Sequence, residues 1–362
     1  MRVSRLSRAI GAFILGITFA LPAAAQEGSS LSRLVDQWIA SPHGDYSSES
    51  FTHWNEDGAV PVNCAACHSG PGFSDFLGAD GSAAGVVDHP APINAPVDCA
   101  ACHTSAAETL DTVSFPSGVT MSGLGSSAIC SVCHQGRQST DSVEAALEGK
   151  ADDTVDPELG FLNIHYAASA ATLMGSDARG GYQYPGKSYA GRFMHVPSAN
   201  TCTTCHEPHT TEVATEGCVA CHQGIEELSD IRTRHADFDG DGDTAEGIHG
   251  EIMTLHGILA ERITAYAADV AGTPIIYDSH AYPYYFTDTD GDGTVDDGEA
   301  AYPNRYQSWT PRLLRAAYNY QVVAKDPGGY SHNPQYFLQL LYDSIEDLSA
   351  QLGVETGALT RP

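Results

Sequence analysis

The chain has 362 residues, and its 46 acidic residues far outnumber its 17 basic ones, which gives a formal net charge of −29 at pH 7. A surface this acidic repels nucleic-acid phosphates and anionic lipid headgroups, so neither is expected as a partner. The same charge attracts basic proteins and divalent cations. The length allows about two domains.

The first residues predict a secretory leader. Arg2, Arg5 and Arg8 precede an apolar run that ends at Leu21, and three alanines follow up to Ala25. This order of basic, apolar and small residues is typical of a signal peptide. The run is shorter than the about 20 residues that a membrane span needs. We therefore expect residues 1–25 to be removed and the protein to be exported to the periplasm or the cell surface, without an integral membrane segment.

The predicted elements after the leader are short. Periodic apolar residues predict a helix over 30–40, and the stretch 59–125 is rich in Gly, Ala, Pro and Asp, which is typical of loops. Two more helices are predicted over 141–149, with Asp141 as N-cap, and over 161–175.

Five C-x-x-C-H motifs use all ten cysteines of the chain. Two thiols and the next histidine in this spacing are the signature of covalent haem c, in which the thiols bind the haem vinyl groups and the histidine binds iron. Five motifs with no cysteine left over argue against a disulfide framework, so the sequence predicts five haems c. The motifs are Cys64-Ala-Ala-Cys67-His68, Cys99-Ala-Ala-Cys102-His103, Cys130-Ser-Val-Cys133-His134, Cys202-Thr-Thr-Cys205-His206 and Cys218-Val-Ala-Cys221-His222.

Each iron needs a second axial ligand, and histidine is the best candidate. Eleven of the 16 histidines lie outside the motifs, whereas methionine is scarce, which favours bis-histidine ligation. His209 is too close to His206 to bind the far side of the same haem, so it is expected to bind a neighbouring one. His165 lies on the helix predicted over 161–175, and His195 precedes the fourth motif. His43 and His53 precede the first motif in an aromatic stretch.

The 140 residues after the last motif contain no haem motif and have a different sequence pattern. A long amphipathic helix is predicted over 246–272, and the pairs Thr310-Pro311 and Asn333-Pro334 open two more that end near Lys325 and before Gly353. We expect a pentahaem domain over 26–224 and a helical C-terminal portion over 225–362. The predicted fold is mainly α-helical and loop-rich, and the haems form much of its core.

Two acidic loops match calcium-binding patterns. The segment 288–299 follows the EF-hand loop, with glycine at position 6 and oxygen ligands around it, and Pro283 makes a helix before it unexpected. The segment 237–243 has only the first half of the pattern, so Glu246 or Glu251 must complete that site. The expected ligands are Asp288, Asp290, Asp292, the Thr294 carbonyl, Asp296 and Glu299, and in the other loop Asp237, Asp239, Asp241 and Asp243. We expect one or two structural calcium ions.

The chain also resembles a known family. The segment CTTCHEPHTTEVATEGCVACH resembles the doubled haem-binding module of multihaem cytochromes of respiratory and extracellular electron transfer. The segments SFTHWNEDGAVPVNCAACHSG, GGYQYPGKSYAGRFMHVPSANTC and LRAAYNYQVVAKDPGGYSHNPQY are similar to multihaem cytochromes with an acidic calcium-loop tail. The resemblance covers most of the chain after the leader. It implies that His53, His165, His195, His209 and His332 serve as distal iron ligands.

Two functions remain open from the sequence. The first is an electron carrier, in which closely packed bis-histidine haems pass electrons between redox protein donors and acceptors, with self-association into multimers or filaments as an extension. The alternative is a reductase of nitrite, hydroxylamine or tetrathionate with one open haem. Pentahaem nitrite reductases often carry a C-x-x-C-K motif at the catalytic haem, and this chain has none.

Overall fold

The computed structural model describes residues 30–362, so the predicted leader lies outside the described residues. Most regular structure in the described part is helical, with two small antiparallel hairpins, β1–β2 and β3–β4. The elements are α1 (Ser30–Ala40), α2 (Glu49–Thr52), α3 (Val62–His68), α4 (Gly70–Phe76), α5 (Cys99–Cys102), α6 (Ser105–Glu108), β1 (Val113–Ser114), β2 (Thr120–Met121), α7 (Ser127–Cys133), α8 (Thr140–Leu147), α9 (Ser169–Met174), η1 (Gly175–Asp177), α10 (Cys202–Cys205), α11 (Glu216–Val219), η2 (Leu228–Asp230), α12 (Ile248–Asp269), β3 (Ile275–Tyr277), β4 (Tyr285–Thr287), η3 (Tyr302–Asn304), α13 (Pro311–Ala324), α14 (Gly329–His332) and α15 (Pro334–Leu352).

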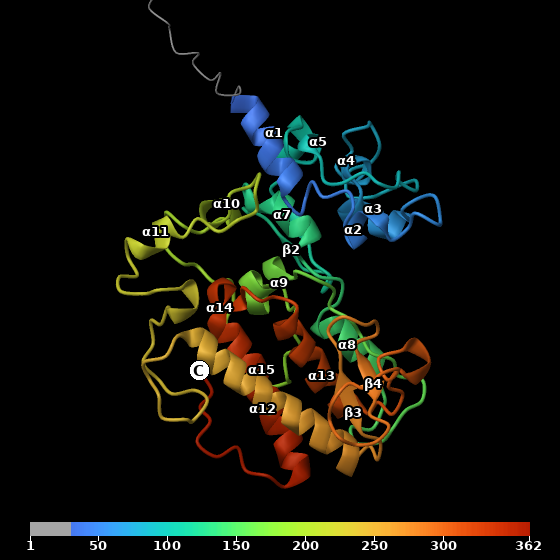
Figure 1. Ribbon diagram of the computed structural model, residues 1–362, viewed down its shortest axis with the longest axis vertical. Helices are drawn as coiled ribbons and strands as arrows, with labels where there is room; N and C mark the ends of the chain where they lie inside the picture. The colour runs from blue at the N-terminus through green and yellow to red at the C-terminus, as the bar shows by residue number, and fades with distance from the viewer. Residues whose placement is uncertain (1–29) are drawn as a thin grey trace, which may run out of the picture.

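The elements divide between two ends of the molecule. The short helices α3, α5, α7, α10 and α11, which carry the five motifs, gather at one end, and the long helices α12, α13 and α15 lie at the other (Figure 1). The short helices α9 and α14 lie between them. The helix and loop content agrees with the predicted fold class.

The long helices build the main hydrophobic core. Helix α12 packs against α13 and α15, and the buried side chains include Leu255, Leu259, Leu313 and Leu340. Burying each of these leucines stabilises the fold by about 1.5–3 kcal/mol. This end therefore folds around ordinary apolar packing.

The main core also contains residues that precede the last motif. Val143, Ile164 and Tyr182 pack into it, and the buried Asn319 of α13 accepts from the Tyr182 N–H at 2.7 Å and donates to its carbonyl at 3.0 Å. Buried amides need such partners, because an unpaired polar group costs about 1–3 kcal/mol. The expected boundary at residue 224 thus does not separate two hydrophobic cores.

The predicted ends of the last two long helices are confirmed. The Thr310 side chain accepts from the Leu313 N–H, and the Asn333 side chain accepts from the Tyr336 N–H, so both residues cap helices that begin with proline. Gly353 ends α15 with φ +68°, a left-handed conformation that suits glycine.

Two helix predictions before the last motif need correction. The helix expected over 161–175 is only α9, which starts at Ser169, and His165 lies in the preceding loop with φ +81°. Helix α8 starts at Thr140, and Ser139 rather than Asp141 is its N-cap. In the first case the apolar residues Phe161, Leu162 and Ile164 face the core from a loop, which periodicity alone cannot distinguish from a helix.

The motif end has much smaller apolar clusters. One gathers around Phe73, Phe115, Leu124 and Met174, and another is limited to Val60, Ala65 and Ala91. The motif helices are only four to seven residues long. Isolated helices this short are unstable in water, so this end needs additional packing partners.

Among residues 30–362, no helix combines the length and the apolar character that crossing a membrane requires.

The α12 packing predicts a stability difference within one helix. Leu255 is fully buried, whereas Met253 on the same helix is 49% exposed. Leu255→Ala should lower the free energy of unfolding by about 2–5 kcal/mol because it leaves a cavity, and Met253→Ala should change it by less than about 0.5 kcal/mol. Denaturant unfolding measures both, and equal losses in the two variants would contradict this packing.

Candidate haem-binding and calcium-binding sites

Each motif lies on or beside one short helical turn. Residues i and i+3 lie on the same face of a helix, so the two cysteines of a C-x-x-C pair point in one direction. Local caps start these turns: the Asp98 side chain accepts from Ala100 N–H and Ala101 N–H at 2.9 and 3.2 Å, and Thr201 and Thr204 form a capping box at α10. None of the ten cysteines forms a disulfide.

One large cavity joins most of the motifs. Its volume is about 2170 Å³, and eight of the ten cysteines and four of the five motif histidines line it. Part of its wall comes from distant segments, including His43, His165, His195 and His332. The second motif's His103 is exposed and lies outside this lining.

Every motif histidine faces a second histidine. The five pairs have similar spacing although their partners come from unrelated parts of the chain. The ring centroids are 5.7 Å apart for His68–His165, 6.3 Å for His103–His209, 6.3 Å for His134–His43, 6.4 Å for His206–His332 and 6.0 Å for His222–His195.

This spacing leaves room for one metal atom. Bonds from a metal to histidine nitrogen are about 2.0–2.1 Å, so two nitrogens on opposite sides of one ion lie about 4 Å apart. The two Nε2 atoms of His68 and His165 are 3.5 Å apart, slightly closer than that. His53 has a different environment. Its ring lies against Trp54 at 4.8 Å, and its Nδ1 pairs with Glu49 at 2.8 Å, so it does not face a motif histidine.

Backbone carbonyls orient three of the motif histidines. The Nδ1 of His68 bonds to the Ser50 carbonyl at 2.9 Å, that of His134 to the Ala167 carbonyl at 2.9 Å, and that of His206 to the Thr211 carbonyl at 3.2 Å. A carbonyl only accepts, so Nδ1 must carry the proton and Nε2 keeps its lone pair. These contacts hold the tautomer that can bind a metal through Nε2.

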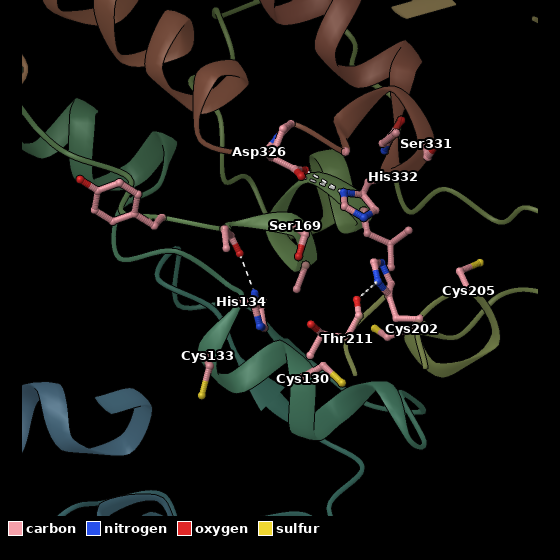
Figure 2. Close-up of a pocket in the computed structure, with 18 of the residues that line it drawn as sticks. Cys130, Cys133, His134, Ser169, Cys202, Cys205, Thr211, Asp326, Ser331 and His332 are labelled. Atoms are coloured by element: carbon pink, nitrogen blue, oxygen red, sulfur yellow. Dashed lines mark hydrogen bonds and ion pairs between the residues drawn. The ribbon is translucent and has the colours of Figure 1, made fainter. Parts of the chain in front are cut away.

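Two of the facing histidines are oriented by carboxylates instead. Asp326 places both oxygens 2.9 Å from Nδ1 of His332, and Glu207 places one oxygen 3.1 Å from Nδ1 of His209. Figure 2 shows His332 between Asp326 and the helix that carries Cys202 and Cys205. Both carboxylates leave Nε2 free on the other side of the ring.

Burial keeps several of these rings neutral. It lowers the pKa of His165 to about 4, with a further contribution from His68, and it also lowers the pKa values of His43 and His68. A neutral imidazole is the form that binds metal. For His332 the pKa is raised, because the Asp326 carboxylate outweighs the opposing effect of burial.

The motifs contact one another in an order that differs from their order in the sequence. Cys67 of the first motif lies 3.9 Å from the Val132 carbonyl, and Cys133 of the third lies 3.7 Å from the Ala66 carbonyl. The third and fourth motifs also meet, since the Cys202 N–H donates to Ser127 of α7 at 3.2 Å.

The loop 288–299 gathers several of its expected carboxylate ligands. Asp288 accepts from the Gly291 and Gly293 N–H groups at 2.7 and 2.9 Å, and oxygens of Asp288, Asp290 and Glu299 lie within 4.8 Å of one another. Strand β4 leads into it, which agrees with the expected lack of an entering helix.

The loop 237–243 repeats the same backbone pattern. Asp237 accepts from the Gly240 and Gly242 N–H groups at 2.5 and 2.9 Å. Glu251, in the first turn of α12, accepts from the N–H of Phe238 at 2.9 Å, as Glu299 accepts from that of Thr289 at 2.7 Å in the other loop. Glu251 therefore makes the backbone contact that Glu299 makes in the other loop. Both expected candidates lie near the aspartates, since oxygens of Asp237, Asp239 and Glu251, and those of Asp239, Asp241 and Glu246, lie within 4.8 Å of one another.

Two carboxylate oxygens in or next to the loop 237–243 have no hydrogen-bond partner. Asp239 Oδ2 and Glu246 Oε1 are buried without hydrogen-bond partners. Burial and the neighbouring carboxylates raise the pKa values of Asp239 and Glu246. Crowded carboxylates of this kind are the oxygen ligands that calcium binds.

Two curated proteins of Geobacter sulfurreducens resemble this chain. C-type polyheme cytochrome OmcC is 27% identical over 400 aligned residues, which cover 90% of this chain and 48% of that protein. C-type polyheme cytochrome OmcB is 26% identical over 407 residues with the same coverage. The resemblance to multihaem c-type cytochromes is thereby confirmed.

The chain spans about half the length of these multihaem relatives. No model of a protein family matches the chain, and no solved structure matches it. The similarity therefore supports haem binding, and the activities of the longer relatives are not assigned to this chain.

Sequence reasoning found the motifs and six facing-histidine candidates, and the structure places five of the six opposite a motif histidine. The exception is His53. The residues that orient the rings were missed, and Asp326 is the clearest example, because nothing in its local sequence marks it. Only its contact with His332 identifies it.

If both acidic loops bind calcium, each single loop variant should bind one calcium ion fewer per chain. The wild-type protein should bind two calcium ions, Asp239→Asn and Asp290→Asn should each bind one, and the double variant none, because each change removes a charged ligand. Calorimetric titration with metal analysis measures this. Asp36→Asn, on the distant helix α1, is the control and should still bind two. Binding that is unaffected by both loop variants would contradict these sites.

Proposed function

We propose that this chain is an exported electron-transfer protein that carries five covalent haems c, each bound between two histidines. The observation that supports it best is the set of five facing histidine pairs, one for each motif, with centroids 5.7 to 6.4 Å apart. The ten motif cysteines, none of them in a disulfide, would provide the attachment points, and the shared cavity provides space. The names of the relatives support the same cofactor.

The pairs support an assignment of the iron ligands. The proximal ligands are the motif histidines His68, His103, His134, His206 and His222, and the distal ligands in the same order are His165, His209, His43, His332 and His195. His53 is left out of this set because it pairs with Glu49.

The chain's own residues bind and orient, and bound haem supplies one-electron chemistry. The ten cysteines fix the position of each group covalently, and the histidine pairs close both faces of each iron. Carbonyls such as those of Ser50 and Ala167 keep the Nδ1 protons in place. Rigid ligands that are the same in both oxidation states minimise rearrangement during electron transfer.

The contacts between motifs suggest the order of the attachment sites. The first motif contacts the third, the third contacts the fourth, and Cys205 of the fourth lies near Cys218 of the fifth. Cys102 of the second motif lies near Cys130. We therefore place motifs one, three, four and five in a row, with the second beside the third.

The facing pairs favour the electron carrier over the reductase. A reductase needs one iron with an open or displaceable position, and here each of the five motif histidines has an imidazole opposite it. The acidic surface suits docking to basic redox proteins. The proposal also includes export to the periplasm or the cell surface and self-association of the chain into multimers or filaments.

The calcium loops have a structural role in this account. The loop 237–243 leads into α12, and Phe238 and Ile248 beside it line the haem cavity. Calcium there would fix the start of α12 against the haem-binding end.

The haem-binding portion 26–224 takes one ligand, His332, from the C-terminal portion 225–362, so the two portions act together.

Two histidine variants test the ligand assignment. In His165→Ala one haem should become high-spin and bind added imidazole, because its iron loses the distal ligand. In His53→Ala all five haems should stay low-spin. Electron paramagnetic resonance and optical spectra distinguish these states, and pyridine haemochrome with intact mass should give five haems in both variants. A high-spin haem in His53→Ala, with none in His165→Ala, would overturn the assignment.

A further inference from the structure

His332 has a buried carboxylate as its orienting partner, whereas the orienting carboxylate of His209, Glu207, is partly exposed. Both oxygens of Asp326 lie 2.9 Å from its Nδ1, and the Asp326 side chain is only 3% exposed. The orienting groups of His68, His134 and His206 are neutral carbonyls. Among the orienting groups named here, Asp326 is the buried carboxylate, and it acts on the pair His206–His332.

The fold holds this contact rigidly. Asp326 directly follows the C-cap of α13, and its carbonyl accepts from the Gly329 N–H at 2.9 Å. The next residue after His332 is Asn333, which caps α15 and donates to the Gly191 carbonyl at 3.0 Å. Gly328 provides the space, because a Cβ at that position would lie 2.9 Å from the His332 ring.

Among residues 30–362, His332 is the single side chain that forms an ion pair with Asp326. The preceding Lys325 points elsewhere: its Nζ lies over the rings of Tyr166 and Tyr284, at 3.7 and 4.1 Å from their centroids. The Asp326 carboxylate therefore directs its charge at the His332 ring, in surroundings where charge is weakly screened.

Glu207 offers a comparison within the same chain. It also contacts a distal histidine, His209, but its side chain is 40% exposed. Its second oxygen accepts from the N–H groups of His209 and Thr210 at 2.8 and 2.7 Å, which divides its charge among three donors. Exposure to water and salt weakens the remaining effect on the ring.

We propose that Asp326 is a positioning residue that gives the haem between His206 and His332 the lowest reduction potential of the five. This inference rests on the proposed function. A carboxylate that attracts the Nδ1 proton makes Nε2 a stronger electron donor, which stabilises ferric over ferrous iron and lowers the potential. In the row of attachment sites, this haem lies between those of the third and fifth motifs.

Asp326→Asn keeps the shape and an acceptor oxygen but removes the charge. In a spectroelectrochemical titration of the full holoprotein, the lowest of the five midpoint potentials should rise, and the other four should stay. The matched variant Glu207→Gln should produce a smaller rise in a different midpoint, and Asp36→Asn none. Unchanged midpoints in an Asp326→Asn protein that still carries five low-spin haems overturn the inference.

A second variant assigns the lowest midpoint without changing Asp326. His332→Met should raise that midpoint, because methionine ligation gives higher potentials than histidine. A rise in a higher midpoint, with the lowest unchanged, overturns the inference. Failure of the proposed function would look different, since the wild-type protein itself would then contain fewer than five low-spin haems.

Discussion

In the proposed function the structure depends on one geometric constraint, which is that two imidazole nitrogens are held about 4 Å apart so that each iron can lie between them. Five short motifs supply one side. The other side comes from the N-terminal segment (His43), two loops (His165 and His195), the fourth motif's own turn (His209) and the C-terminal portion (His332). Segments that are far apart in the sequence, from residue 43 to residue 332, therefore meet at the end that carries the motifs.

The helical end of the molecule supports that arrangement. Helices α12, α13 and α15 form an apolar core that needs no cofactor, and the junction between α13 and α15 carries both Asp326 and His332. The loop 237–243 connects the same core to the last motif. The helical end thus positions His332, a proposed ligand, and its orienting carboxylate for the end that lacks a large apolar core of its own.

Sequence reasoning could predict what is local. The C-x-x-C-H motifs, the loop 288–299 and the proline-initiated helices are short patterns with fixed chemistry. Pairing is not local: His43 and His134 are 91 positions apart by number, and only the folded chain brings their rings together. The resemblance implied His53 rather than His43 as a ligand, whereas the structure places His43 opposite His134, and His165 was expected on a helix but lies in a loop. Side-chain contacts such as Asp326–His332 leave no sequence pattern.

The measurement that tests the central claim most directly is low-temperature electron paramagnetic resonance of the ferric wild-type protein before and after addition of nitrite or hydroxylamine. If every iron lies between two histidines, the spectrum contains only low-spin haem, and neither ligand changes it. A high-spin signal, or a haem that converts on ligand addition, would show an open iron and contradict the account of a closed electron carrier.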